Sequence, residues 1–563
     1  MQTKILPVGL EDYKEMVDGN YYYVDKTMLI RKLRDAGGKA NLFLRPRRFG
    51  KTLTLSMLKH FYEDTGDPEQ NAANRALFGS MKIMCEPAPY RDNMTAYPVI
   101  SLTLKSAKQD TFQAALSVLK EIIASEFMRH NAVYEGLSNE TYRDRWNHIV
   151  SLKGELEEYS TSLLFLSRRL SEAYGKRAVI LIDEYDVPLE SAYFKDYYDK
   201  MVSFIRLLFE SALKTNPSLE FAVLTGCLRV SRESIFTGMN NLLIMSVLDE
   251  YFGEYYGFTQ DELDEMLRYY QRESRREDLR RWYNGYMIGG QRVYNPWSSV
   301  NSVRAVLQAE GAPLRPYWSN TSSNDIVRIL VEKSGAQGRA ELEGLLAGGT
   351  LIKPIREDIT YADLTRPGDN LWDFMLFTGY LTAVSVWQDG IDIMAELVIP
   401  NKEVESIYRN KIREWFNDSV RQRDLSGFYK AVVDGCAHMA EEFLRDILGK
   451  TISYYDYAEN YYHGILTGLF SGMETHIARS NRESGLGRPD IALIPLNIWG
   501  TVVIIEIKIC EKAMDMEKEA QAALEQIERQ GYESEYRSEG FQSFIWYGAA
   551  FYKKNVVLRV KGV

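Results

Sequence analysis

The stretch NLFLRPRRFGKTLTLSML (residues 41–58) joins a short apolar run to a helical pattern through a basic loop. The run Asn41–Arg45 predicts a buried strand, and Leu53–Tyr62 predicts the helix that follows it. The loop RPRRFGKT (45–52) ends in the Gly-Lys-Thr of the phosphate-binding pattern GxxxxGK[ST], although Arg45 stands where that pattern begins with glycine. Backbone N–H groups at such a strand–loop–helix junction bind phosphate oxygens. The stretch therefore predicts a nucleotide-binding loop; a plain basic turn before an amphipathic helix is the alternative.

Each residue type in the loop suits a contact with a nucleotide. Gly50 lets the backbone approach a phosphate, Lys51 reaches the β- and γ-phosphates, and the Thr52 hydroxyl can hold Mg²⁺. Arginines at 45, 47 and 48 are expected to add positive charge to the loop. The predicted nucleotide-binding residues of the loop are Arg48, Phe49, Gly50, Lys51, Thr52 and Leu53.

Three more apolar runs, 97–104, 177–183 and 219–225, alternate with helical patterns in the first part of the chain. Strand–helix alternation predicts a parallel sheet covered by helices on both faces, the α/β architecture of phosphate-loop NTPases. The second run ends in two carboxylates. Asp183 is expected to hold Mg²⁺ together with the loop threonine, and Glu184 to polarise the attacking water.

The third apolar run ends at Thr225, with Arg229 shortly after it in TGCLRVSRESIF. On the strand next to the acidic one, Thr225 would sense the γ-phosphate. Arg229 would contact the nucleotide phosphates, and a surface salt bridge explains this arginine equally well.

A second candidate site lies near the C-terminus, in GRPDIALIPLNIWGTVVIIEIK (487–508). Glu506 and Lys508 share one face of a strand, and Asp490 opens the strand before it. The carboxylates of Asp490 and Glu506 and the carbonyl of Ile507 are hard oxygen ligands for Mg²⁺ or Mn²⁺. Lys508 would stabilise charge or position the water that attacks a phosphodiester. A structural Glu–Lys pair on a solvated strand is the alternative.

The helix expected before these strands carries a further acidic residue, Glu459. It is a candidate metal ligand of the same site, although a glutamate on a helix surface is the more ordinary explanation.

Composition narrows the class of protein. The chain has 563 residues, 68 Lys+Arg and 78 Asp+Glu, which gives a net charge of −10. This balance argues against a surface that binds nucleic acid everywhere, but it allows a local basic cleft. Four scattered cysteines without a CxxC pair exclude a Cys-rich zinc site and a disulfide scaffold, and they fit a reducing cytoplasm. No secretory signal and no apolar stretch of about 18 residues is evident, so a soluble cytoplasmic protein without membrane association is expected.

The pattern along the chain predicts four parts. We expect a phosphate-loop domain over 1–255, a mostly helical middle domain over 256–400, a helical connector over 401–450 and a compact α/β domain over 451–563. The middle part contains two aromatic stretches, RWYNGY (281–286) and VYNPWS (293–298), for which core packing is the default interpretation.

Several stretches together resemble a known family, the bacterial AAA-ATPase-like proteins with a C-terminal PD-(D/E)XK nuclease-like domain. The resemblance spans nearly the whole chain and rests on FLRPRRFGKTLTLSML, VILIDEYDVPL, TGCLRVSRESIFTGMNNL, the two aromatic stretches, and SNRESGLGRPD followed by IIEIK. An arginine in place of the first loop glycine is usual in that family. The resemblance implies ATP binding and a restriction-endonuclease-like fold, with roles for Gly50, Lys51, Thr52, Asp183, Glu184, Asp490, Glu506 and Lys508.

The leading hypothesis is an ATP-binding and ATP-hydrolysing protein coupled to a Mg²⁺-dependent phosphodiesterase that acts on DNA or RNA. In a second hypothesis the nucleotide switches an interaction protein whose nuclease-like fold is only a docking module. A stand-alone nuclease with a purely structural N-terminal part is a third, weaker one. The sequence leaves open the choice between DNA and RNA, and whether the chain forms homo-oligomers.

Overall fold

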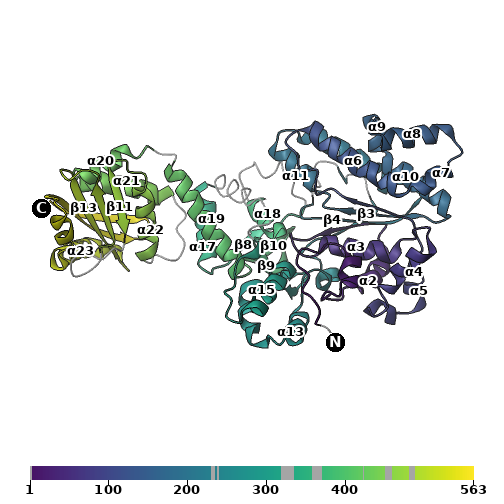
Figure 1. Ribbon diagram of the computed structural model, residues 1–563, viewed down its shortest axis with the longest axis horizontal. Coiled ribbons are helices and arrows are strands. Elements are labelled where there is room, and N and C mark those ends of the chain that lie inside the picture. Colours follow the sequence, from purple (N-terminus) through teal and green to yellow (C-terminus); the bar gives the residue numbers. More distant parts are fainter. Residues whose placement is uncertain are drawn as a thin grey trace. The chain divides into compact units, whose positions relative to one another are not determined.

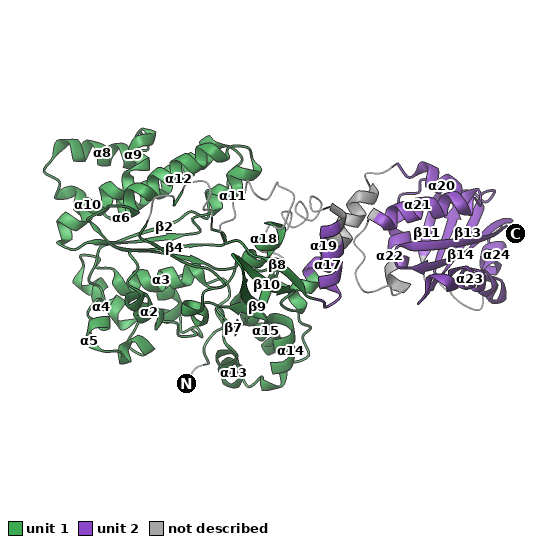
Figure 2. Cartoon of the chain, turned by 180° about the vertical axis from the view of Figure 1, so that it is seen from behind, with its two compact units in different colours: residues 1–334, 350–406 green, residues 335–349, 407–563 purple. Residues whose placement is uncertain are grey.

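The computed structural model describes residues 3–229, 235–236, 240–318, 335–357, 370–421, 424–450, 459–480 and 489–562. It divides into two compact units (Figure 2). Unit 1 contains residues 1–334 and 350–406, and unit 2 contains residues 335–349 and 407–563. The predicted four-part division of the chain stays a prediction.

A five-stranded parallel sheet forms the centre of unit 1, with strand order β2-β3-β4-β1-β5. The order places β4 between β1, which precedes the phosphate-binding loop, and β3, which ends in the acidic pair. Every residue of β1 and β3 is buried, as expected for strands with helices on both faces. The strands are β1 (Ala40–Leu44), β2 (Val99–Thr103), β3 (Ala178–Asp183), β4 (Leu219–Gly226) and β5 (Leu242–Met245).

Helices cover both faces of this sheet (Figure 1), which confirms the predicted α/β architecture. One face carries α2 (Leu29–Ala36), α3 (Lys51–Tyr62), α4 (Pro68–Ala76) and α5 (Ala88–Arg91), and the short α1 (Tyr13–Asp18) packs on α3. The other carries α6 (Phe112–Arg129), α7 (Asn131–Glu135), α8 (Glu140–Val150), α9 (Leu156–Ser160), α10 (Ser162–Tyr174), α11 (Val187–Phe194) and α12 (Tyr198–Leu213).

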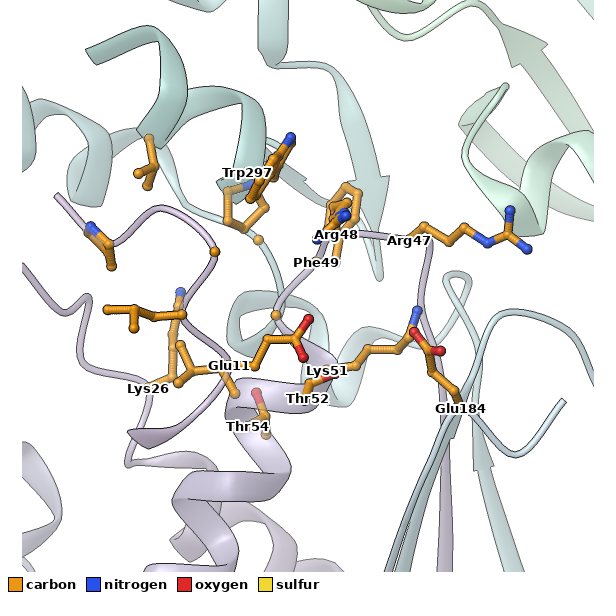
Figure 3. A pocket seen from close by; sticks show the side chains of 18 of the residues that line it. Glu11, Lys26, Arg47, Arg48, Phe49, Lys51, Thr52, Thr54, Glu184 and Trp297 are labelled. Carbon is orange, nitrogen blue, oxygen red and sulfur yellow. The ribbon is translucent and has the colours of Figure 1, made fainter. Parts of the chain in front are cut away.

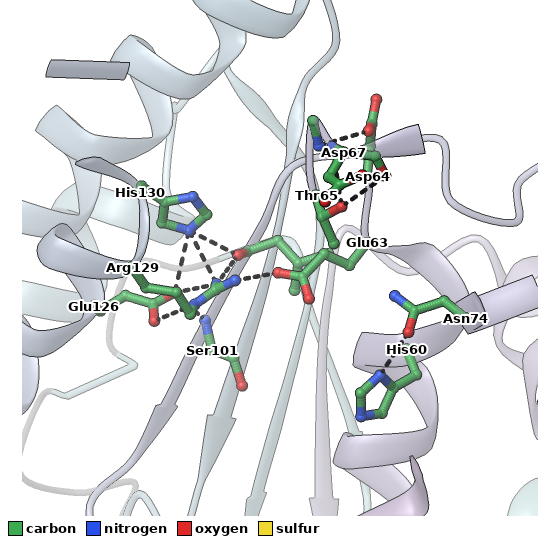
Figure 4. A network of polar contacts seen from close by, with 12 residues as sticks. His60, Glu63, Asp64, Thr65, Asp67, Asn74, Ser101, Glu126, Arg129 and His130 are labelled. Atoms are coloured by element: carbon green, nitrogen blue, oxygen red, sulfur yellow. Dashed lines mark hydrogen bonds and ion pairs between the residues drawn. The ribbon is translucent and has the colours of Figure 1, made fainter. Parts of the chain in front are cut away.

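A buried polar network ties α3 to α6 at the start of strand β2 (Figure 4). Glu126 Oε1 accepts hydrogen bonds from the Ser101 N–H (2.7 Å) and from Arg129 (2.6 Å), and Arg129 also pairs with Glu63 after the end of α3. Burial alone would raise the pKa of Glu126, but the hydrogen bonds and charges of Arg129 and His130 outweigh it and lower that pKa to about 2. The Glu126 carboxylate is therefore charged, and it accepts a hydrogen bond from a backbone N–H of the edge strand β2.

The middle of the chain is mostly helical, as predicted, and it also contains two small antiparallel sheets that the sequence did not predict. Its helices are α13 (Gln260–Tyr269), α14 (Arg276–Tyr283), α15 (Pro296–Gln308) and α18 (Asn370–Thr378). Strands β6 (Tyr286–Ile288) and β7 (Gln291–Val293) form a hairpin, and β8 (Leu351–Pro354), β9 (Thr382–Asp389) and β10 (Asp392–Val398) pair in the order β8-β10-β9.

Unit 2 is built on a five-stranded mixed sheet, β11-β12-β13-β14-β15, in which β13 and β14 are parallel and the other neighbours are antiparallel. Its strands are β11 (His476–Ser480), β12 (Ile491–Pro495), β13 (Thr501–Ile509), β14 (Ser543–Tyr552) and β15 (Asn555–Gly562). Its helices are α17 (Gly335–Leu346), α20 (Ser426–Val433), α21 (Ala437–Lys450), α22 (Glu459–Phe470), α23 (Met516–Gln530) and α24 (Glu533–Ser538). This confirms the predicted C-terminal α/β domain.

Successive side chains of β13 point to opposite faces of the sheet, so they pack in two different hydrophobic cores of unit 2. Val503, Ile505 and Ile507 pack in the core with α20–α22, whereas Val502 and Ile504 pack in the core with α23 and α24. Side chains at even-numbered positions of β13 therefore face α23, and among them are the predicted site residues of this strand.

Candidate active sites

The loop between β1 and α3 has a backbone suited to an anion. Arg48 and Gly50 both have left-handed φ angles, +69° and +82°. Such alternation turns successive N–H groups toward the same side of the chain. Gly50 is the N-cap of α3 and supplies no side chain to the first turn, so the N–H groups at the start of the helix have no side-chain cap. An anion in front of α3 would meet these N–H groups and the positive end of the helix dipole.

Lys51 is held against its own loop. Its side chain is 6% exposed, and Nζ donates to the carbonyl oxygens of Arg45 (2.8 Å) and Pro46 (3.0 Å). The Cys227 Sγ lies 3.4 Å from the same nitrogen. A phosphate in front of the loop would offer the ammonium a charged acceptor in place of neutral carbonyls.

Asp183, the last residue of β3, forms side-chain hydrogen bonds with one residue of α3 and one residue of β4. The Thr52 hydroxyl donates to Asp183 Oδ2, and the Thr225 hydroxyl donates to Asp183 Oδ1, both at 2.6 Å. Asp183 and Thr225 are buried, and Thr225 has no exposed surface. The Thr225 hydroxyl thus orients the Asp183 carboxylate through this hydrogen bond. The predicted contact of Thr225 with a γ-phosphate stays a prediction. Together, the Thr52 hydroxyl and the Asp183 carboxylate fit a hard cation such as Mg²⁺.

Glu184 follows Asp183 in a left-handed conformation, φ +51°, which a glutamate seldom adopts. Its carboxylate lies beside the Lys51 ammonium in the cavity (Figure 3). Burial raises the pKa of Glu184, the charge of Lys51 opposes this effect, and Asp183 reinforces it. A partly desolvated carboxylate of raised pKa is a better base than a solvated one.

Sequence reasoning missed Asp186, the third acid of IDEYD. Its Oδ2 accepts hydrogen bonds from the backbone N–H groups of Cys227 (2.7 Å) and Leu228 (3.0 Å), directly after β4. Asp186 therefore fixes the chain that follows Thr225. Burial raises the pKa of Asp186 although these N–H groups oppose the rise. The only signal for it in the sequence was a third carboxylate at the end of the strand.

The loop faces a cavity of about 360 Å³ (Figure 3). Its lining includes residues 47–52 and Glu184 together with the apolar or aromatic residues Leu10, Tyr22, Phe258, Trp297 and Val300. The predicted nucleotide-binding residues that line it are Arg48, Phe49, Gly50, Lys51, Thr52 and Leu53. Arg229 is half-buried and lies outside this lining, so its predicted phosphate contact also stays a prediction.

The expectation that three arginines add charge to the phosphate-binding loop needs correction for Arg45, whose guanidinium lies outside the lining of the cavity that the loop faces. Its guanidinium is fully buried and donates to the carbonyls of Met245 (2.8 Å) and Ser246 (2.6 Å) at the end of β5. Burial lowers the pKa of Arg45 to about 10. Arg47 forms an ion pair with Glu190 at 2.6 Å. The Arg48 guanidinium lies over the ring of Trp297, which lines the cavity.

The second site lies where β12 and β13 meet. Asp490 precedes β12, and its Oδ2 accepts a 2.7 Å hydrogen bond from the N–H of Ile507 on β13. Gln526 of α23 donates to Glu506 Oε1, and His463 of α22 hydrogen-bonds the Asp490 carbonyl at 2.9 Å. Asp490 and Glu506 are only 8% and 4% exposed. The structure thus brings the two predicted carboxylates to adjacent strands and shows what orients each of them.

The structure describes less of the remaining predicted residues of this site, Lys508 and Glu459. Lys508 is half-buried and shares the α23-facing side of β13 with Glu506. Glu459 begins α22, but its side chain lies outside the described residues, as do residues 481–488 of the SNRESGLGRPD stretch. Within the described part of the chain, no group of three or more His, Cys, Asp or Glu side chains is arranged to hold a metal. The described carboxylates and the carbonyl of Ile507 nevertheless have the oxygen chemistry that Mg²⁺ or Mn²⁺ prefers.

Comparison with known proteins matches both sites to families. The family described as "Predicted AAA-ATPase" matches residues 7–236, which include the loop, Asp183 and Thr225. The family described as "PD-(D/E)XK nuclease superfamily" matches residues 457–561, which include Asp490, Glu506 and Lys508. The chain has an AAA-ATPase-like domain followed by a PD-(D/E)XK nuclease-like domain.

One relative aligns with this chain along nearly the whole length of both proteins. An uncharacterized protein in the vnfD 5′ region of Azotobacter chroococcum mcd 1 is 25% identical over 558 residues, covering 96% of this chain and 95% of its own length. No helix in the described residues is long and apolar enough to cross a bilayer.

Proposed function

We propose that unit 1 binds and hydrolyses ATP, and that unit 2 is a metal-dependent phosphodiesterase acting on nucleic acid. The observation that carries the first half is the position of Asp183, which accepts hydrogen bonds from Thr225 and from Thr52, the residue next to the loop lysine. Such an arrangement of hydroxyl, carboxylate and lysine is suited to a nucleotide phosphate with Mg²⁺. The AAA-ATPase-like match supports the same conclusion.

In this proposal the loop and the acidic end of β3 each make different contacts with ATP. The N–H groups before and within the first turn of α3 bind phosphate oxygens, and Lys51 leaves the Arg45 and Pro46 carbonyls to pair with the β- and γ-phosphates. Thr52 and Asp183 would hold Mg²⁺, which neutralises phosphate charge when bound. Glu184 orients a water molecule and accepts its proton.

The nuclease half of the proposal rests on two carboxylates at neighbouring strands, that of Asp490, which bonds the Ile507 N–H, and that of Glu506, which bonds Gln526. Asp490, Glu506 and the Ile507 carbonyl would hold Mg²⁺ or Mn²⁺, which activates a water molecule and stabilises the phosphate charge when bound. Lys508 positions that water or stabilises the charge that develops on the phosphodiester. Gln526 keeps Glu506 in place through its side-chain amide. Glu459 is proposed as a further carboxylate ligand.

The second hypothesis, a nucleotide-switched interaction protein, is favoured by two observations. The carboxylates of Asp490 and Glu506 both already accept protein hydrogen bonds, and the chain is acidic overall, with a net charge of −10. A docking module would use this site for structure and would bind no phosphodiester.

Incubation of the purified chain with labelled single-stranded and double-stranded DNA and RNA separates the two hypotheses. Each substrate is tested with Mg²⁺ or Mn²⁺, with and without ATP. We expect metal-dependent cleavage of at least one substrate, and Asp490→Asn, which keeps the shape of the side chain, as the matched inactive control. Nucleotide binding without cleavage of any substrate would favour the docking module.

A further inference from the structure

The two aromatic stretches of the middle region each contact the phosphate-binding loop. The Arg48 guanidinium lies 4.4 Å from the centre of the Trp297 ring, and the Phe49 ring meets the Tyr286 ring edge-on at 5.0 Å. Phe49 and Tyr286 are each only 2% exposed, so this contact is part of a packed interior. Trp297 belongs to VYNPWS and Tyr286 to RWYNGY. Two consecutive loop residues thus contact two different stretches, one each.

RWYNGY also holds the beginning of the next long helix, α19 (Lys402–Arg421). Asn401 Nδ2 donates to the Asn284 carbonyl (2.8 Å), and Asn401 Oδ1 accepts from the Val404 N–H (3.1 Å) and so caps the helix. Gly285 has a φ of +107°, and a Cβ there would stand 2.1 Å from the Pro400 carbonyl oxygen. Only glycine allows the motif to approach the start of α19 this closely.

VYNPWS holds the same helix through a buried carboxylate. Glu403, in the first turn of α19, has no exposed surface. Its Oε1 accepts hydrogen bonds from the Ser298 hydroxyl (2.8 Å) and from the Trp318 N–H (2.9 Å). Ser298 directly follows Trp297, on which Arg48 stacks. A fully buried carboxylate is costly, and here it connects α15 to α19.

Helix α19 is shared by the two units. Its residues to Ser406 belong to unit 1, and those from Ile407 belong to unit 2. The first turn of α19 therefore lies in unit 1, and the same helix continues into unit 2.

The loop satisfies Lys51 through its own backbone, because Nζ donates to the carbonyl oxygens of Arg45 and Pro46. A bound phosphate would take the ammonium away from those carbonyls, and the loop segment that carries Arg48 and Phe49 lies between them and Lys51. Because closely packed side chains shift together between discrete arrangements, such a movement of the loop would also displace the residues that contact Arg48 and Phe49.

We propose that Arg48 and Phe49, the stretches RWYNGY and VYNPWS, and Asn401 with Glu403 form a relay that carries nucleotide occupancy to the first turn of α19. This inference rests on the proposed nucleotide binding in unit 1. It assigns the two aromatic stretches a role in coupling the nucleotide site to α19.

Hydrogen–deuterium exchange of the full-length chain tests the relay, with Mg²⁺–ATPγS as the added nucleotide. Asn401→Asp keeps the helix cap but removes the donor to the Asn284 carbonyl. Ser298→Ala removes the hydroxyl that bonds Glu403. Ser302→Ala is the matched control, because Ser302 lies one turn further along α15, is equally buried, and bonds only the Ser299 carbonyl.

In the native chain and in Ser302→Ala, nucleotide should slow exchange at the start of α3 and change it at residues 402–411. In Asn401→Asp and Ser298→Ala the response of α3 should persist while the response of residues 402–411 is lost. An unaltered α19 response in both variants, or its absence in the native chain despite protection of α3, would overturn the relay. Absence of protection at α3 in the native chain would overturn the proposed nucleotide binding itself, and the relay with it.

Discussion

The Thr225 hydroxyl, fully buried on β4, donates a 2.6 Å hydrogen bond to Oδ1 of Asp183 on the neighbouring strand β3. This contact exists because β4 lies between β1 and β3 in the sheet. It leaves Oδ2 of Asp183 to accept a hydrogen bond from Thr52 at the start of α3.

Replacement of Thr225 by valine keeps the shape of the side chain and removes this hydrogen bond. We expect Thr225→Val to lower kcat for ATP about tenfold or more, because a hydrogen bond to a charged group contributes about 1.5–3 kcal/mol. Thr225→Ser restores the hydroxyl and should recover most of the rate. A valine variant with native turnover would show that Asp183 needs no such support.

The Glu126 network should make stability depend on acid pH. The folded-state pKa of Glu126 is about 2, below the ordinary value near 4.5, so the folded state binds fewer protons there than the unfolded chain. Its contribution is fully present above about pH 4.5 and is lost as the pH falls toward 2. The shift corresponds to roughly 3 kcal/mol.

Glu126→Gln removes that contribution, so the native chain should lose about half of its stability advantage over the variant between pH 5 and pH 3. Urea unfolding of both proteins at the two pH values measures the difference. Equal differences at the two pH values would contradict the role given to the Glu126 charge.

Glu403 should have the opposite pH dependence. Burial raises the pKa of Glu403 to about 7, against its hydrogen bonds from Trp318, Ser298 and Tyr317. The folded state then binds more protons than the unfolded chain, so this contribution is complete below about pH 4.5 and is lost as the pH rises through 7. Glu403→Gln, which has no charge, should gain stability relative to the native chain between pH 5 and pH 8, by up to about 3 kcal/mol.

Urea unfolding at pH 5 and pH 8 measures this gain for Glu403→Gln. An unchanged difference between variant and native chain would mean that Glu403 titrates near its ordinary pKa. Ser302→Ala, on the same helix as the Glu403 partner Ser298, should show no such pH dependence.

Two substitutions test the nuclease-like site. Asp490→Asn and Lys508→Met should each lower metal-dependent cleavage of nucleic acid at least about 100-fold, because both groups act on the reacting phosphate or its metal. Circular dichroism should show that both variants keep the fold. Cleavage that continues undiminished in either variant would remove that residue from the mechanism.

Local patterns were enough to predict the central strands and the loop. The runs that form β1, β3 and β4 are mostly apolar; every residue of β1 and β3 is buried, and β4 is buried over most of its length. Because β1, β3 and β4 are parallel, their carboxyl ends meet at one edge, so the proximity of Thr52, Asp183 and Thr225 could be expected from the sequence.

Contacts between distant segments could not be predicted in this way. Arg45 is buried because the Met245 and Ser246 carbonyls, about two hundred residues away, accept its hydrogen bonds. Strand β9 was missed because most of its residues are exposed on both sides, which hides the alternation of a half-buried strand. Glu403 and its partner Ser298 also lie far apart in the sequence, and no local pattern links them.

ATP binding and turnover by the full-length chain, compared with Lys51→Ala and Glu184→Gln, test the central claim most directly. We predict that the native chain hydrolyses ATP, that Lys51→Ala loses binding, and that Glu184→Gln binds ATP normally while its turnover falls at least about 100-fold. Turnover that survives both substitutions would contradict the claim.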